Sequence, residues 1–133
     1  MLDIGALNFL AILLAAMAKF IIGGFWFSKM LFGQMWLDEV DLKEEELGSP
    51  KNAMIIGFGL CLLVSFSFAA LLQMLALDLR SSVAVAVIVA IGITSAQLGL
   101  SFAFEGRSLK LFLIYAIQCV AEFAAVVLIL GLM

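Results

Sequence analysis

The chain has no histidine, a single proline and two cysteines among its 133 residues. Without histidine it lacks the commonest metal ligand and the commonest general base. Cys61 and Cys119 both lie within apolar runs, so we interpret them as small packing residues and not as a disulfide framework. The sequence also lacks a nucleophile motif, paired aspartates and a phosphate-binding loop, and we therefore expect no enzyme activity, no cofactor and no metal site.

Charge is scarce as well. Only 13% of the residues are charged, against about 25% in an ordinary soluble domain, and 66% are hydrophobic. A soluble fold of this length cannot bury so much apolar surface, so lipid must cover it. Seven lysines and arginines without a basic cluster predict no nucleic-acid binding. We expect membrane lipids as partners, with a second copy of the chain or another membrane protein as further candidates.

Four apolar runs are long enough to cross a membrane. The last two are the clearest, because Val83 to Phe104 holds 22 residues without a charge and Leu111 to Met133 holds 23 interrupted only by Glu122. At about 1.5 Å per residue, each run crosses a hydrocarbon core of about 30 Å as a helix. The predicted fold is all-α, an integral membrane protein with an antiparallel bundle of four transmembrane helices. One domain, 1–133, has spans at about 4–27, 51–77, 82–104 and 109–132.

Residues 28–50 form the one long loop between spans. Trp26 and Trp36 fit the aromatic belt of a membrane surface, and we predict both as interfacial anchors. The acidic run 37–47 predicts a short surface helix, and its carboxylates lack the spacing of a calcium loop. Pro50 suits the first position of the helix that follows.

Basic residues are distributed unevenly between the two sides of this arrangement. The positive-inside rule counts these residues and largely ignores acidic ones. We therefore predict that residues 28–50 and 105–110 face the cytoplasm of a bacterial cell, that the membrane is its inner membrane, and that both termini are non-cytoplasmic. The terminal side carries only Arg80, whereas the other side carries Lys29, Lys43, Lys51, Arg107 and Lys110.

Two charges lie inside the predicted spans. A charge near the centre of a span costs about 2.5–3.5 kcal/mol on insertion scales. Lys19 and Glu122 fall on opposite sides of mid-span, at backbone levels that differ by about 7 Å. An extended lysine and a glutamate can bridge that separation, so we predict that the two side chains face one another inside the bundle. The alternatives are a Lys19 that snorkels to the surface and a protonated Glu122 among neighbouring helices.

Span three carries a stripe of small residues at helical spacing: Gly92, Ser95, Ala96 and Gly99. Such stripes let membrane helices approach one another closely. We predict that these four residues face other helices and not lipid. A pore lining is the alternative interpretation.

The turn before span four holds several charges. We expect Gly106 to end one helix and Ser108 to cap the next. In a structural interpretation, Glu105 bonds Arg107 or Lys110, and the two basic side chains contact lipid phosphates. Together with a serine after span one, these charges form a candidate cytoplasmic-face cluster of Ser28, Glu105, Arg107 and Lys110.

Two signatures can be compared with a known family. The first contains Gly23, Trp26-Phe27-Ser28, Leu31-Phe32-Gly33 and Trp36, and the second runs from Phe104 to Phe112. Together they resemble a family of small four-span membrane proteins known as domain of unknown function 1761. Lys29 stands where that family has proline, and residues 114–119 depart from its fourth span. The resemblance implies a four-span architecture and transfers no activity.

Two functions follow from these observations. The first is a structural or accessory membrane protein that acts through helix packing and through contacts with lipid or a partner. The second is a small transporter or channel in which a polar path is lined by Lys19, Gln97, Gln118 and Glu122. A polar path between helices would favour transport, and a dry core with an apolar outer groove would favour the accessory role.

Overall fold

The computed structural model describes residues 1–40, 48 and 50–133. This part of the chain contains helices and turns but no strand. Four helices are long and apolar enough to cross a membrane, which confirms the predicted all-α, four-span class. They are α1 (Phe9–Trp26), α3 (Pro50–Leu75), the run Leu79–Glu105 and α6 (Leu109–Leu132).

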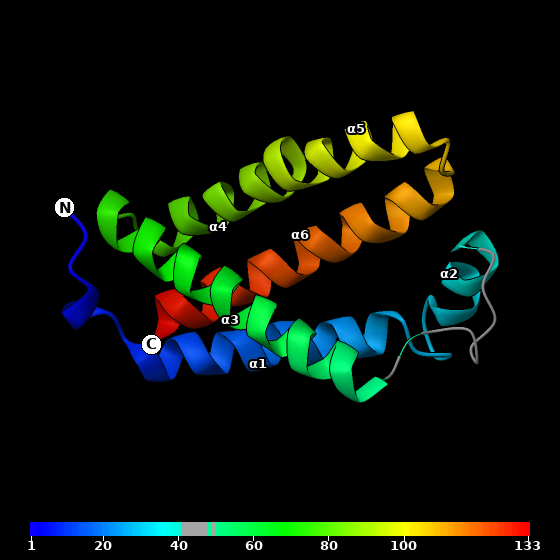
Figure 1. Cartoon of the computed structure of the whole chain (residues 1–133). Coiled ribbons are helices and arrows are strands. Elements are labelled where there is room, and N and C mark those ends of the chain that lie inside the picture. Colours follow the sequence, from blue (N-terminus) through cyan, green and yellow to red (C-terminus); the bar gives the residue numbers. More distant parts are fainter. Residues whose placement is uncertain (41–47, 49) are drawn as a thin grey trace.

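The chain turns back after each span (Figure 1). Both termini and the turn at residues 76–78 therefore lie at one end of the molecule, which we call the terminal end. The short helix α2 (Gly33–Val40) and the turn at residues 106–108 lie at the other, which we call the loop end. The acidic helix predicted over 37–47 is described only as far as Val40; its remainder lies outside the described residues.

Capping residues explain where the spans begin and end. α1 begins later than expected, because Ile4–Ala6 forms a separate 3-10 turn and Asn8 accepts a hydrogen bond from the Ala11 amide as the cap. The third span begins earlier than expected, because Asp78 caps it and accepts from the Ser81 amide at 3.0 Å. Hydrogen bonds from the Ser81 side chain and backbone hold the pKa of Asp78 below its usual value.

The last turn is built as predicted. Gly106 has a φ of 70°, the left-handed conformation that glycine adopts without strain at the end of a helix. Ser108 then caps α6 by accepting a hydrogen bond from the Leu111 amide at 3.0 Å. This tight reversal places the beginning of α6 directly beside the end of the third span (Figure 1).

α6 is the central helix of the bundle. It packs against α1 on one side and against the first half of the third span on the other, while α3 lies mainly on α1. Close approach is possible because the contacting face of α1 consists of alanines. Ala11, Ala15 and Ala16 have no exposed surface. The main core lies toward the terminal end and includes Ala15, Phe68, Ala86, Ala90, Phe123, Val126 and Val127.

The third span is not a regular α-helix. It runs from α4 (Leu79–Ile88) through the π-helical segment η3 (Val89–Ser95) into α5 (Ala96–Glu105). A π-turn bonds each amide five residues back and so inserts one extra residue into the helical phase. The buried positions follow this insertion: they recur every four residues at Ser82, Ala86 and Ala90, and then after five residues at Ser95, within the π-helical segment.

This phase shift corrects the predicted packing stripe. Gly92 is exposed and a Cβ added there would meet nothing within 4 Å, so the prediction that it faces another helix of the chain is wrong. Ala96 is exposed too, but it lines a surface cavity together with Phe112 and Ala116 of α6. Ser95 is buried, and a Cβ added at Gly99 would lie 3.0 Å from the Phe112 ring, so these two positions do face protein. The expected stripe assumed an uninterrupted α-helix, whereas the π-helical segment shifts the helical phase, and Gly92 and Ser95 do not share one face.

Candidate functional site

The two charges inside the spans meet in the structure. Lys19 Nζ lies 2.6 Å from Glu122 Oε2, within hydrogen-bond distance. The Glu122 side chain is 4% exposed and that of Lys19 is 16% exposed, so the carboxylate lies deeper than the ammonium. The predicted pairing between the first and last spans is therefore present.

The carboxylate of Glu122 has a second partner on its own helix. Gln118 Nε2 donates to Glu122 Oε1 at 2.8 Å, one helical turn away. Gly23 of α1 makes room for this arrangement, because a Cβ at that position would lie 3.0 Å from the same oxygen. Sequence reasoning named Gln118 only as part of a transport path, although its spacing of four residues from Glu122 could have indicated this bond.

The ion pair lies where two cavities meet. One cavity, of about 490 Å³, lies between α1 and α3 and includes Gly57 and Cys61 in its lining. The other, of about 480 Å³, lies between α3, α5 and α6 and includes Leu98 and Phe102. Both are lined by Lys19, Val64, Gln118 and Glu122.

A third cavity, of about 320 Å³, extends the second one toward the terminal end. It opens at the surface, since Leu63 and Thr94 in its lining are exposed, and its wall includes the rings of Phe68 and Phe123, whose centroids lie 5.0 Å apart. We call the second and third cavities together the lateral groove. It is lined by Lys19, Leu63, Val64, Ser67, Phe68, Leu71, Val89, Thr94, Leu98, Phe102, Arg107, Tyr115, Gln118, Cys119, Glu122 and Phe123.

The lateral groove changes character along its length. Its loop-end part contains charged and polar groups, among them Arg107 and the ion pair, whereas its terminal-end part is almost wholly apolar. Beyond Phe123 the helix α6 continues with Val126 and Val127, which have no exposed surface. Gln97 is exposed on α5 and does not line either cavity of the groove, so the predicted four-residue polar path is not formed.

The two predicted interfacial anchors bond to the protein. Trp26 Nε1 donates to the Ile114 carbonyl at 3.0 Å, and Trp36 Nε1 donates to Tyr115 Oη at 2.7 Å. Both indoles are half-buried and lie at the loop end, where Trp36 also stacks on Phe27 with ring centroids 4.9 Å apart. They attach α1 and α2 to α6; their position relative to lipid stays a prediction.

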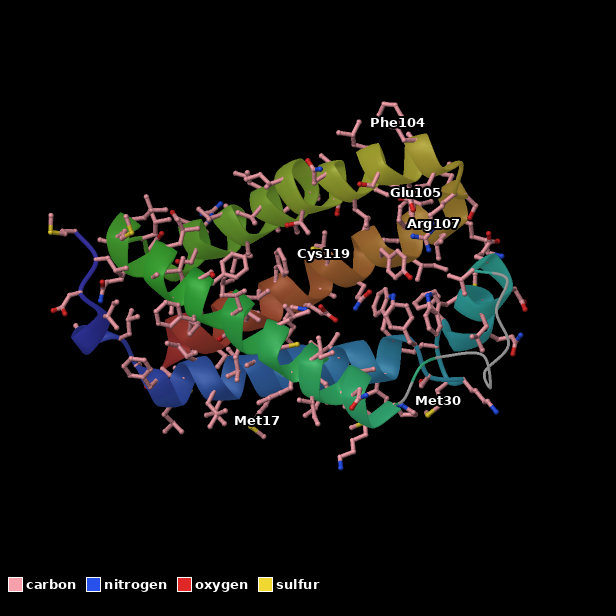
Figure 2. All side chains as sticks on the ribbon, in the orientation of Figure 1. Met17, Met30, Phe104, Glu105, Arg107 and Cys119 are labelled. Carbon is pink, nitrogen blue, oxygen red and sulfur yellow. The ribbon has the colours of Figure 1, made fainter. Side chains whose placement is uncertain are left out.

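The predicted cytoplasmic-face cluster does not form as one group. Ser28 donates to the Phe25 carbonyl, Arg107 lies over the Phe102 ring, and Glu105 is exposed at the end of α5. Figure 2 shows Glu105 and Arg107 at the turn between α5 and α6, with Phe104 projecting away from the bundle.

Lys110 takes its partner from α2 instead of from its own turn. Glu39 Oε1 lies 3.9 Å from Lys110 Nζ, and Glu39 Oε2 accepts a hydrogen bond from Ser108 Oγ at 2.6 Å. A capped helix beginning is a favourable place for a carboxylate, because its free amides carry partial positive charge. Sequence reasoning missed Glu39, since nothing in the spacing indicates that α2 folds back onto the start of α6.

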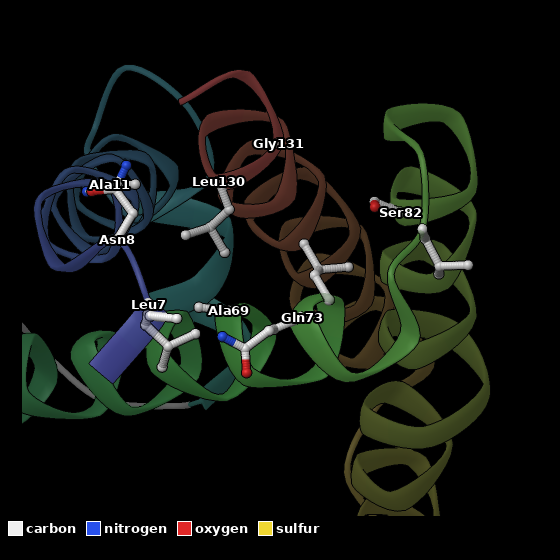
Figure 3. A pocket seen from close by; sticks show the side chains of 11 residues that line it. Leu7, Asn8, Ala11, Ala69, Gln73, Ser82, Leu130 and Gly131 are labelled. Carbon is white, nitrogen blue, oxygen red and sulfur yellow. The ribbon is translucent and has the colours of Figure 1, made fainter. Parts of the chain in front are cut away.

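A separate cavity of about 250 Å³ lies at the terminal end (Figure 3). Gln73 at its edge accepts from the Asp3 amide at 2.7 Å and donates to the Asp3 carbonyl at 2.9 Å. Both halves of the Gln73 amide are thus used to hold the segment before α1 against α3. The polar group at the edge of this cavity is therefore already engaged within the protein, and we do not interpret the cavity as a ligand site.

The chemistry available to the described residues is limited. They contain no group of three or more metal-ligating side chains, and both cysteines are free thiols. The lateral groove therefore offers a partly buried ion pair, a few hydrogen-bonding groups and a long apolar wall.

Four apolar spans around a central helix define the class: this is an integral membrane protein with a helical bundle. The chain belongs to the family described as protein of unknown function (DUF1761), whose sequence profile matches residues 10–131. The resemblance seen in the two sequence signatures is thereby confirmed. Searches of curated proteins and of solved structures found no match.

Proposed function

We propose that this chain is a non-catalytic accessory protein of the bacterial inner membrane that holds a membrane lipid in its lateral groove. The groove itself supports this proposal. It opens beside Leu63, which is 60% exposed, and its inner wall includes the paired rings of Phe68 and Phe123. In a bilayer such a space must be filled, and an acyl chain matches its apolar wall.

The proposal includes an orientation. The loop end, with α2 and the turn at residues 106–108, faces the cytoplasm, and both termini face outward. The support is the basic bias of the loop end, where Lys29, Lys51, Arg107 and Lys110 lie among the described residues, against Arg80 at the terminal end.

A pair of neighbouring substitutions tests the binding role. Thr94 lines both cavities of the lateral groove, whereas Ile93 is 62% exposed and lines neither. Thr94→Phe should fill the groove, and Ile93→Phe adds a ring of the same size elsewhere on the same segment. Native mass spectrometry after mild extraction should show a retained lipid on the wild-type protein and on Ile93→Phe, and less on Thr94→Phe. A wild-type protein without retained lipid, or equal retention by all three, would contradict the proposal.

A small transporter is the second candidate, and the ion pair favours it. Lys19 and Glu122 are charged groups within spans, a placement typical of transport pathways and proton relays. The apolar contact between Phe68 and Phe123 argues against a continuous polar path through a single copy. Ion and proton flux in liposomes would separate the candidates: flux that Glu122→Gln abolishes would favour transport over the accessory role.

A further inference from the structure

We infer that the lateral groove binds a phospholipid whose phosphodiester is held by Arg107 and Tyr115 and whose acyl chain lies along the apolar wall. This inference rests on the proposed function and specifies its ligand. It depends on three features of the loop end: a guanidinium with unused donors, a phenol with an unused proton, and an apolar channel that leads away from both.

Arg107 is held in place without using its hydrogen bonds. Its Cζ lies 4.4 Å from the centroid of the Phe102 ring, and that ring is only 3% exposed. This cation–π contact uses no hydrogen bond to an N or O acceptor, and the guanidinium carries five N–H donors. Among the described residues no carboxylate or carbonyl accepts a hydrogen bond from this side chain, so a ligand in the groove can use these donors.

Tyr115 supplies a second donor to the same part of the groove. Its oxygen accepts the hydrogen bond from Trp36 at 2.7 Å, which leaves its own O–H proton available. Its ring packs edge-on against Phe102, with centroids 5.7 Å apart. Phe102 thus orders both Arg107 and Tyr115, and a positive charge beside a hydroxyl donor is a suitable receptor for a phosphate oxygen.

The depth of this pair matches that of a lipid phosphate. The third span has 27 residues and is therefore about 40 Å long, against about 30 Å of hydrocarbon, so roughly 5 Å of helix extends beyond the hydrocarbon at each end. Phe102 lies three residues from the end of the span at Glu105, or about 4.5 Å. The guanidinium over Phe102 is therefore placed at the boundary between headgroups and acyl chains.

The rest of the groove fits one acyl chain. From Phe102 to Val89 the wall of the third span is 13 residues long, or about 20 Å, which is about two-thirds of a hydrocarbon core of about 30 Å. Val64, Phe68 and Phe123 line this part from the other helices. A partner helix would leave the phosphate receptor empty, and a free phosphate would leave the channel empty; a phospholipid fills both.

Binding can be measured on the whole protein in a maltoside detergent, which contains no phosphate. Thermal unfolding is followed while phosphatidylglycerol, diacylglycerol or glycerol phosphate is added. Phosphatidylglycerol should stabilise the wild-type protein most, since it alone carries both phosphate and acyl chains. Arg107→Gln should weaken its apparent affinity about ten-fold, the scale of one hydrogen bond to a charged group, and Tyr115→Phe should weaken it as well.

Two controls separate binding from folding and from general charge. Lys110→Gln removes a neighbouring positive charge whose partner is Glu39, and Trp36→Phe removes the hydrogen bond to Tyr115 but keeps the phenol. Both should retain the response to phosphatidylglycerol.

The outcomes distinguish this inference from the proposed function. Equal responses to diacylglycerol and phosphatidylglycerol would leave the groove as a lipid site but overturn the phosphate assignment. An equal loss in Lys110→Gln and Arg107→Gln would overturn it too, since general attraction would then explain binding. No response to any chain-bearing lipid would overturn both proposals.

Discussion

Both oxygens of the Glu122 carboxylate are occupied, one by Lys19 and the other by Gln118. Removing one charge of such a pair leaves the other in a poorly solvated place, which costs about 3–5 kcal/mol for fully buried pairs. Lys19→Met and Glu122→Gln should each lower the thermal stability in detergent. The double variant should be more stable than the sum of the two losses predicts, because it contains no unpaired charge.

The control for this cycle is Lys51→Met, which removes an exposed lysine near the beginning of α3 and should change stability little. If the losses of Lys19→Met and Glu122→Gln simply add in the double variant, the two residues are independent in the folded protein. That result would contradict the pair as a stabilising contact.

Two glycines of the third span offer a matched comparison. A Cβ at Gly99 would lie 3.0 Å from the Phe112 ring, whereas a Cβ at Gly92 would meet nothing within 4 Å. Gly99→Leu should therefore destabilise the protein by about 1–3 kcal/mol through overpacking. Gly92→Leu should be neutral or stabilising, since leucine favours the helix by up to about 1 kcal/mol over glycine. Chemical unfolding in mixed micelles measures both; equal effects would contradict the assigned faces.

At the level of single residues, the sequence predicted contacts that depend on depth in the membrane. Lys19 and Glu122 could be matched because a helix converts sequence position directly into depth. The partner of Lys110 could not be predicted in this way, since Glu39 reaches it from a loop whose path is set by tertiary packing. Arg107 was placed at the lipid surface, but its stacking on Phe102 required the structure.

At the level of elements, the turn between the third and fourth spans was predictable, whereas helix phase and the starts of the first and third spans were not. Gly106 and Ser108 are local signals whose geometry is fixed by the residues themselves. The π-turn at Val89–Ser95 has no such local signal, although the segment contains Gly92, Thr94 and Ser95. The segment packs on α6, and its buried residues Ala90 and Ser95 are five positions apart, as a π-turn requires of residues on one face.

The π-turn predicts how the third span responds to deletions. Removing Ile91, which is exposed within η3, should convert the segment to regular α-helix and keep Ala90 and Phe102 on the buried face. Removing Leu100, which is exposed within α5, should instead rotate the residues after it by about 100° and turn Phe102 away from Tyr115. The first variant should stay folded and monodisperse on size-exclusion chromatography, while the second should lose stability.

Comparing the two deletions separates an effect of helix phase from a general effect of shortening the span. Both remove one large apolar residue from the exposed side of the same span, so a general effect of shortening would be equal in the two proteins. Equal stability of the two variants would show that the π-turn does not set the packing phase.

At the level of the whole molecule, the lengths of the apolar runs were sufficient to predict four spans and an all-helical fold. The lateral groove was not predictable, because it depends on α3 packing mainly on α1 while α5 contacts α6 only slightly. Hydropathy indicates that a helix is apolar enough to lie in a membrane or a protein core, but it does not indicate how far apart two neighbouring helices lie. The ion pair was therefore predicted without the cavity that gives it access to a ligand.

The orientation of the whole molecule is the last prediction. The structure places residues 28–40 and the turn at residues 106–108 at the loop end, so Lys29 and Arg107 lie at that end, whereas Arg80 lies at the terminal end (Figure 1). By the positive-inside rule, the end with more basic residues faces the cytoplasm. In a variant with Cys61→Ala and Cys119→Ala, a reagent that does not cross the inner membrane should label Asp3→Cys in intact cells. It should label Met30→Cys, an 82% exposed position at the loop end, only after the membrane is opened. Labelling of Met30→Cys in intact cells would reverse the orientation, and labelling of both positions would mean that the chain inserts in two directions.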